Sequence, residues 1–377
     1  MRFAEGHYLL SFSENCGKIT VTMRKGGRLV LLERLSERFV FAFLPELEPV
    51  WGAISVLSGE RVHTLCTEIY GAEQLAVWRR KYSFLFETYA AISEHCNLSI
   101  LDYLLDLPLE DISVGALREI VLAEQPEEFV WRQLSLGYFC KDADKETLRK
   151  ALTDDTALDT AYGWVADRCG SFLAFAAFVR QSERFITEFF SLAADMQTPA
   201  LEAALEQQRS KIERMYTTVC EGSKENEPLA FSQELMGKTF RNRGPYAEFV
   251  FLPSYLLPMR ACRFFDTEGE HKRQLLFLTL RQLSRNREDK VKALKAIADP
   301  TRYQILTLLA QEGPMRGMDI AKKVSVATST ISHHMEQMKE CGLITEEPVK
   351  NAKYYGLSQQ SAKALLDEIA KDFEIVL

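Results

Sequence analysis

The stretch from Asp299 to Leu357, DPTRYQILTLLAQEGPMRGMDIAKKVSVATSTISHHMEQMKECGLITEEPVKNAKYYGL, decides how this chain is interpreted. It opens with a helix start at Asp299-Pro300, because an acidic N-cap accepts a free backbone N–H and proline at the first helical position loses no hydrogen bond. Apolar residues then share one side of this helix: Ile305, Leu306 and Leu309. Such a stripe requires a core to pack against, and Gly313-Pro314 ends the helix.

A second, shorter helix and a tight polar connection lead into Thr328–Lys339. On a helical wheel, one face of this segment is apolar: Ile331, Met335 and Met338. The other face is polar: Ser329, Ser332, His333, Glu336 and Gln337. A short helix, a turn and a second helix with an outward polar face are typical of the helix-turn-helix, whose second helix lies in the major groove of DNA.

Two strand-like runs follow. Cys341-Gly342 resembles a helix C-cap, and the runs Leu343–Glu347 and Lys353–Leu357 are joined by Pro348–Ala352. This predicted hairpin is the wing of a winged helix-turn-helix.

The pattern resembles the winged helix-turn-helix of ArsR/SmtB-family transcriptional regulators. Four matching segments occur in the family's order: Leu294–Leu306, Ser329–Met335, Gly342–Ile344 and Tyr354-Tyr355. The resemblance covers roughly the last quarter of the chain and none of the first 280 residues. It implies a DNA-binding transcriptional regulator, by the family's common habit a repressor. It also implies a homodimer on a palindromic operator, with half-sites about one helical turn apart.

The sequence departs from the family at its usual metal sites. The first of these positions reads Pro314–Met318, and the C-terminal helix Ser358–Phe373 contains no His or Cys. Thioether alone is a weak substitute for thiolate or imidazole, so metal sensing at these sites is not expected. A further departure is Ala327, where the family usually has a serine N-cap. Either Thr328 or Ser325 substitutes for it, or the start of the helix loses roughly 1 kcal/mol of capping.

The resemblance also places candidate DNA contacts. In the second helix of the predicted helix-turn-helix, here called the reading helix, we expect them at Thr328, Ser329, Thr330, Ser332, His333, His334 and Gln337. In the wing we expect contacts to the flanking backbone at Lys350, Asn351 and Lys353. Glutamine suits adenine among the base edges. A metal or catalytic role for the two histidines is the weaker alternative, since adjacent helical residues point about 100° apart. The lysines also fit an ordinary solvated turn.

Length and charge indicate two or three domains. The chain has 377 residues and a formal charge of −7, with 47% hydrophobic and 26% charged residues. From residue 287 onward 13 Lys and Arg balance 13 Asp and Glu, so the excess acid lies upstream, 40 acidic residues against 33 basic. We therefore predict a sensing or regulatory domain at 1–285 and a DNA-binding and dimerisation domain at 286–377.

The first domain is predicted to be α+β and mainly helical. Strands are expected at both of its ends: Tyr8–Phe12, Lys18–Met23, Arg28–Leu32, Ala247–Leu252, Arg260–Phe265 and Gln274–Leu280. The early strands are expected to pair with the late ones. Between them, helices are predicted at Ala72–Leu107, Gly115–Ala123, Glu127–Leu136, Lys145–Leu152, Thr160–Cys169, Ser171–Ala194 and Ala200–Cys220. A further helix, Leu283–Ala298, leads into the winged helix. A dimer stripe is expected on the last helix: Leu365, Leu366, Ile369 and Phe373.

Cysteines and hydropathy indicate a reduced cytoplasmic protein. The eight cysteines form no pair at metal-ligand spacing, which favours buried free thiols over a redox or metal role. The longest apolar run, Phe172–Val179, is far shorter than the roughly 20 residues that cross a bilayer, so no membrane partner is expected.

Common catalytic signatures are missing from the sequence. It contains no G-x-S-x-G, P-loop, G-x-G-x-x-G or H-E-x-x-H motif. We therefore expect a non-enzymatic regulator without a cofactor, whose first domain senses a small-molecule effector. Two alternatives remain: an enzymatic first domain regulated by the winged helix, and a winged helix that binds protein instead of DNA. A pocket with convergent polar groups in residues 1–285 would favour the sensor.

Overall fold

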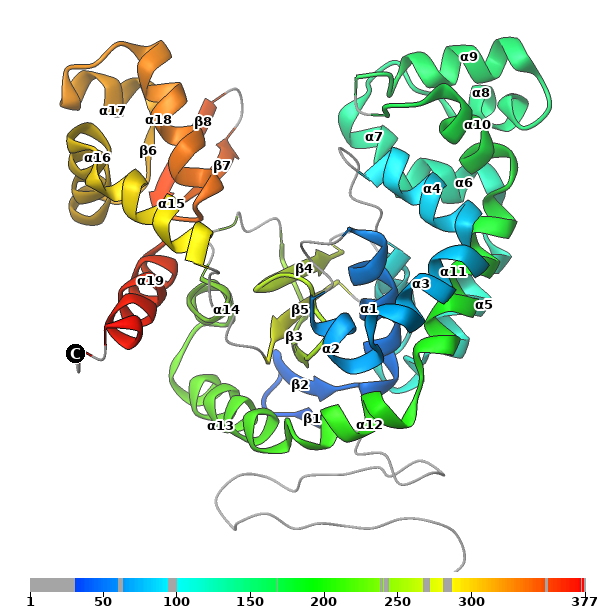
Figure 1. The fold of residues 1–377 in the computed structure, drawn as a ribbon, viewed down its shortest axis with the longest axis horizontal. Coiled ribbons are helices and arrows are strands. Elements are labelled where there is room, and N and C mark those ends of the chain that lie inside the picture. The colour runs from blue at the N-terminus through cyan, green and yellow to red at the C-terminus, as the bar shows by residue number, and fades with distance from the viewer. Residues whose placement is uncertain are drawn as a thin grey trace, which may run out of the picture. The chain divides into compact units, whose positions relative to one another are not determined.

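The chain forms two compact units in a computed structural model (Figure 1). The first unit comprises Met1–Glu225 with Gly244–Arg281, and the second comprises Asn226–Arg243 with Gln282–Leu377. The structure describes residues 31–59, 64–93, 100–167, 169–237, 240, 244–266, 272–280, 287–349, 352–373 and 375. Two predicted strands, Tyr8–Phe12 and Lys18–Met23, lie outside these residues.

A five-stranded sheet in the order β1-β2-β3-β5-β4 organises the first unit. Its strands are β1 (Leu31–Arg34), β2 (Phe39–Phe43), β3 (Glu248–Ser254), β4 (Ala261–Phe265) and β5 (Arg273–Thr279). The inner strands β2, β3 and β5 run parallel, and the edge strands β1 and β4 pair antiparallel. Phe39 of β2 pairs with Phe249 of β3, so an early strand does pair with a late one, but β2 is not among the predicted strands. The described end of the predicted strand Arg28–Leu32 belongs to β1, which pairs with β2 instead of a late strand.

Alternate residues of β2 face two different layers. Val40 and Ala42 enter the main helical core on one side of the sheet. On the other side, the ring of Phe41 packs edge-on against Tyr216 of α13 (Arg209–Glu225), with 5.4 Å between ring centroids. Every residue of β2 is buried, as expected for an inner parallel strand that is covered on both faces.

The helical body packs against the first of these faces. Its 3₁₀ and α-helices before residue 125 are η1 (Pro45–Leu47), α1 (Glu48–Leu57), α2 (Thr64–Tyr70), α3 (Ala72–Lys81), α4 (Ser83–Ser93), η2 (Ile100–Asp106), η3 (Leu109–Asp111) and α5 (Val114–Ala123). The later helices are α6 (Pro126–Gln133), α7 (Leu136–Phe139), α8 (Lys145–Ala151), α9 (Asp155–Gly163), α10 (Phe172–Arg180), α11 (Ser182–Met196) and α12 (Pro199–Glu206). Trp51 of α1 meets Phe277 of β5 with ring centroids 5.0 Å apart, which joins this body to the sheet.

Several predicted helices are divided or displaced. The predicted helix Ala72–Leu107 is wrong as a single element, because α3 ends at Tyr82 and η2 is a separate 3₁₀ helix. Three more predicted helices each consist of two elements. The predicted Ser171–Ala194 breaks at Gln181 into α10 and α11. The predicted Glu127–Leu136 is α6 followed by α7, and the predicted Ala200–Cys220 is α12 followed by α13. The predicted Thr160–Cys169 is displaced, since Asp154 caps α9 by accepting a hydrogen bond from the backbone N–H of Ala157 at 2.7 Å.

A buried arginine fixes η2 beside the sheet. The Nη2 group of Arg273 in β5 donates to the carbonyls of Leu104, at 2.8 Å, and Leu105, at 3.2 Å, and also contacts the Leu107 carbonyl. Leu104 and Leu105 lie in the last turn of η2, so one side chain binds two carbonyls at the end of this helix. Burial lowers the pKa of this guanidinium from its usual value.

The second unit contains the predicted winged helix-turn-helix. Its elements are α14 (Pro228–Met236), α15 (Arg287–Ala298), α16 (Pro300–Glu312), β6 (Met315–Arg316), α17 (Gly317–Val324), α18 (Thr328–Glu340), β7 (Ile344–Val349), β8 (Ala352–Leu357) and α19 (Gln359–Asp372). A small sheet in the order β6-β8-β7 forms the wing and its base. The apolar core of the second unit includes Ile305, Ile331 and Met335. The predicted fold class, a mainly helical α+β chain with a C-terminal winged helix, is confirmed.

None of the described helices is long and apolar enough to cross a bilayer.

Candidate nucleic-acid interface

The helix α18 presents a polar face above a packed apolar one. Ile331, Met335 and Met338 are buried in the core of the second unit. Five of the expected DNA-contacting residues are exposed: Thr328, Ser329, Thr330, Ser332 and His333. The other two on this helix, His334 and Gln337, are half-buried. The wheel therefore separates the packed face correctly, and the exposed residues form one continuous polar strip.

The start of α18 has no side-chain cap. Ala327 is the N-cap residue and forms no such hydrogen bond. Of the two expected outcomes, a substitute cap or a lost cap, the structure has the second. Thr328 already lies inside the helix, and Ser325 ends α17 in the left-handed conformation with φ 56°. The free N–H groups at this end are exposed donors, and helix N-termini attract phosphate.

Gln337 is turned toward another helix. Its Oε1 accepts from Nη1 of Arg302 in α16, and its Nε2 lies 3.1 Å from Nε2 of His333. Arg302 is itself held by the backbone, donating from Nε to the Ala296 carbonyl at 2.8 Å and from Nη2 to the Lys295 carbonyl at 3.1 Å. Sequence reasoning missed Arg302, which lies 35 positions before Gln337.

His334 lies at the edge of the packed face. Among the described residues its Nδ1 is buried and has no hydrogen-bond partner. Burial is the main cause that lowers the pKa of His334, and the nearby charges of Arg302 and His333 lower it further, against the opposing effect of Asp299. The lowered pKa favours the neutral imidazole, which attracts a phosphate less strongly than the charged form does.

The wing carries one described lysine of the expected set. Lys353 is exposed on β8 and pairs with Glu346 of β7 at 3.1 Å, and Glu346 also lies 3.5 Å from Lys339. Lys350 and Asn351 lie outside the described residues. At the base of the wing the sequence analysis missed Arg316, whose Nε donates to the Tyr354 hydroxyl at 2.7 Å and whose guanidinium covers the Tyr354 ring.

Groups of three or more His, Cys, Asp or Glu side chains that can hold a metal ion do not occur among the described residues.

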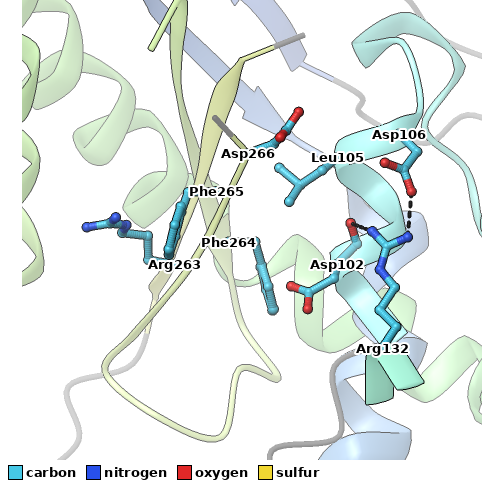
Figure 2. Close-up of a pocket in the computed structure, with 8 residues that line it drawn as sticks. All are labelled: Asp102, Leu105, Asp106, Arg132, Arg263, Phe264, Phe265 and Asp266. Atoms are coloured by element: carbon cyan, nitrogen blue, oxygen red, sulfur yellow. Dashed lines mark hydrogen bonds and ion pairs between the residues drawn. The ribbon is translucent and has the colours of Figure 1, made fainter. Parts of the chain in front are cut away.

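A pocket of about 340 Å³ lies in the first unit, between β4 and η2 (Figure 2). Its lining combines charged, aromatic and aliphatic side chains: Asp102, Leu105, Asp106, Arg132, Arg263, Phe264, Phe265 and Asp266. Arg132 donates to the Asp106 carboxylate at 2.7 Å and to the Asp102 carbonyl at 2.9 Å. In Figure 2 the side chain of Asp102 extends from η2 toward the ring of Phe264 on β4, and Arg263 points away beyond Phe265.

Comparison with known proteins concerns the second unit. The family described as "Bacterial regulatory protein, arsR family" matches residues 299–346, from the start of α16 into β7. A cadmium resistance transcriptional regulatory protein, a CadC homolog of Staphylococcus aureus, is 31% identical over 83 residues, which cover 22% of this chain and 69% of that protein. The chain belongs to the ArsR family.

Two Bacillus subtilis repressors also match a fifth to a quarter of this chain. The transcriptional repressor SdpR is 37% identical over 81 residues, or 20% of this chain and 89% of that protein. The arsenical resistance operon repressor is 33% identical over 90 residues, or 24% of this chain and 83% of that protein. Among solved structures, NolR from Sinorhizobium fredii matches 24% of this chain and 88% of its own, at 26% identity and a TM-score of 0.20. These matches concern the ArsR-type unit.

Proposed function

We propose that this ArsR-family chain is a sequence-specific transcriptional repressor whose α18 reads operator DNA. The observation that supports this proposal is the exposed polar face of α18, which lies opposite a buried apolar face and comprises Thr328, Ser329, Thr330, Ser332 and His333. A β-hairpin wing follows this helix. The spacing of a short α17, a turn and α18 suits insertion of the second helix into the major groove. The known repressors SdpR and the arsenical operon protein support the direction of regulation.

We propose further that two copies bind a palindrome. Helices α15 and α19 pack together through contacts that include the pair Lys290–Asp372. They also expose large apolar side chains: Val291 (42%), Leu294 (40%), Leu366 (57%) and Phe373 (67%). A second copy would cover this surface, whereas Leu365 of the expected stripe is already buried in the unit's own core. Two-fold symmetry then predicts half-sites about 34 Å apart.

The test is selection of random-sequence duplexes by the purified full chain. Wild type should enrich a palindrome, and Ser332→Ala combined with His333→Ala should weaken binding to it by roughly 10-fold or more, because base contacts are each worth about 1–3 kcal/mol. Gln311→Ala, an exposed change on α16, is the matched control and should bind as wild type does. Equal affinity and equal preference in the double variant would show that α18 is not the reading helix.

We also propose that the first unit senses a small organic cation in the β4–η2 pocket. Its volume suits a small molecule, and its lining has three carboxylates against two guanidinium groups. Both guanidinium groups are engaged with protein: Arg132 covers the Tyr103 ring at 3.9 Å and pairs with Asp106, and Arg263 covers the Phe265 ring at 4.3 Å. This excess of one carboxylate over the guanidinium groups, beside the Phe264 ring, suits a ligand that carries a cationic and a flat apolar part.

Benzamidine is a suitable probe, and neutral benzamide is its isosteric control. Calorimetry should detect benzamidine and not benzamide, and Asp102→Asn should weaken benzamidine binding by about 10-fold, since a hydrogen bond to a charged group contributes about 1.5–3 kcal/mol. Asp111→Asn removes a carboxylate from η3 outside the pocket and should leave binding unchanged. Equal binding of the two probes, or an equal loss in both variants, would contradict a cation site in this pocket.

A further inference from the structure

Arg302 of α16 is held by backbone carbonyls of α15 and contacts Gln337 of the reading helix α18. Its side chain is 14% exposed, and it donates to the carbonyls of Ala296 and Lys295 at the end of α15. Its guanidinium also lies 4.0 Å from the Asp299 carboxylate. A guanidinium has five N–H donors and no acceptor, and it stays protonated in proteins. The atom that Arg302 presents to α18 is therefore a hydrogen-bond donor under all physiological conditions.

This donor fixes the orientation of the Gln337 amide. Because Nη1 of Arg302 can only donate, the Gln337 atom that meets it must be the carbonyl oxygen, Oε1. The NH₂ group then lies on the other side, 3.1 Å from Nε2 of His333. An amide nitrogen can only donate, so Nε2 of His333 must accept. Neutral His333 consequently carries its proton on Nδ1.

We infer that Arg302 is a positioning residue that makes α18 present hydrogen-bond donors, and so favours guanine at one position of each half-site. The inference rests on the proposed DNA-binding function. His333 is exposed and offers Nδ1–H, while the oxygen of Gln337 faces inward. Guanine presents two acceptors in the major groove, N7 and O6, whereas adenine requires an acceptor for its N6 amino group. An unrestrained glutamine would pair with adenine, and the contact with Arg302 removes that option.

The histidine tautomer can be measured without DNA. Full-length chain labelled with ¹⁵N-histidine reports the protonated ring nitrogen through two-bond ¹H–¹⁵N correlations, recorded at alkaline pH, with the His333 signals assigned by loss in His333→Gln. Wild type should show the proton on Nδ1 of His333. Gln337→Leu should release His333 toward the Nε2–H tautomer. A proton on Nε2 in wild type, or an unchanged tautomer in Gln337→Leu, would overturn the inference.

Base preference supplies the second readout. In selection experiments wild type should favour guanine over adenine by about 10-fold at one position of each half-site, within the range of a single good base contact. Gln337→Leu and Arg302→Met, which removes the donor, should reduce that preference to below about 3-fold and leave other positions unchanged. Gln311→Ala should keep the wild-type preference.

The two variants and two readouts separate the possible failures. Arg302→Met also loosens the contact with α15, so thermal melts must accompany it, whereas Gln337→Leu leaves Arg302 and its backbone contacts in place. A selected operator with the same base preferences in both variants would overturn this inference alone. Failure of wild type to select any sequence would overturn the proposed function, and the assignment of guanine with it.

Discussion

His334 makes the stability of the second unit depend on pH. Burial holds its pKa below the usual value of 6.5, so the folded form favours neutral imidazole while the unfolded chain binds a proton near that value. The free energy that neutral His334 contributes to folding is therefore fully present above about pH 6.5. It is lost as the pH falls below this value toward the pKa of the folded state. The charged and titratable groups that face His334 are Asp299, Arg302 and His333.

We expect His334→Gln to reduce this dependence. The melting temperature of the wild-type chain should fall more than that of the variant between about pH 7.5 and 5.5, because glutamine takes up no proton in this range. Thermal denaturation followed by circular dichroism measures the difference, and Gln311→Ala, an exposed change on α16, is the control. A gap between wild type and His334→Gln that stays constant with pH would contradict a buried neutral imidazole.

At the same scale, sequence reasoning finds the exposed face but not its internal bonds. A helical wheel places Gln337 with Ser332 and His333, because all three point away from the apolar stripe. It contains no information on Arg302, which reaches Gln337 only after α15, α16 and α18 have packed. The expectation that glutamine suits adenine therefore treats the side chain as unrestrained, and the structure shows its oxygen already bound.

Elements are predictable from sequence when their ends carry local signals. Asp299-Pro300 marks the start of α16 correctly, and Asp299 accepts the backbone N–H of Arg302 at 2.9 Å. By contrast, α3 and α10 end at Tyr82 and Gln181, with φ values of −113° and −123°, and neither position has a nearby glycine or proline to announce the break. Apolar periodicity continues across both breaks, so one long helix is predicted where two form.

The strand β2 is not detected by the apolar–polar alternation pattern, for a different reason. Its sequence Phe-Val-Phe-Ala-Phe is apolar throughout, since both of its faces are covered, and it lacks the alternation typical of half-buried strands. Its partner β3 lies about 200 residues later, and only that long-range pairing gives β2 its place. The β4–η2 pocket depends on the same sheet and on Arg273, so its residues carry no common signal in the sequence.

At the scale of the whole molecule, charge sets how strongly salt acts on DNA binding. The chain is acidic overall, and residues 287–377 are neutral, with 13 basic and 13 acidic side chains. Lysines in residues 287–377 form ion pairs with glutamates of the same segment, as in Lys323–Glu312, Lys292–Glu340 and Lys353–Glu346. Exposed pairs of this kind are weak, so Lys353 can exchange Glu346 for a phosphate at little cost. On α17, Lys322 is exposed and forms no ion pair among the described residues.

We therefore expect a shallow salt dependence. If each protomer uses two or three cations, the slope of log K against log salt for a dimer is roughly −4 to −5, about half that of proteins with ten phosphate contacts. Lys322→Ala should make the slope less steep by roughly 2, one contact being lost in each protomer, while Lys363→Ala on α19 should leave it unchanged. Fluorescence anisotropy with the selected operator at several salt concentrations gives these slopes. A slope near zero would mean that phosphates contribute nothing and would favour a protein partner for the winged helix.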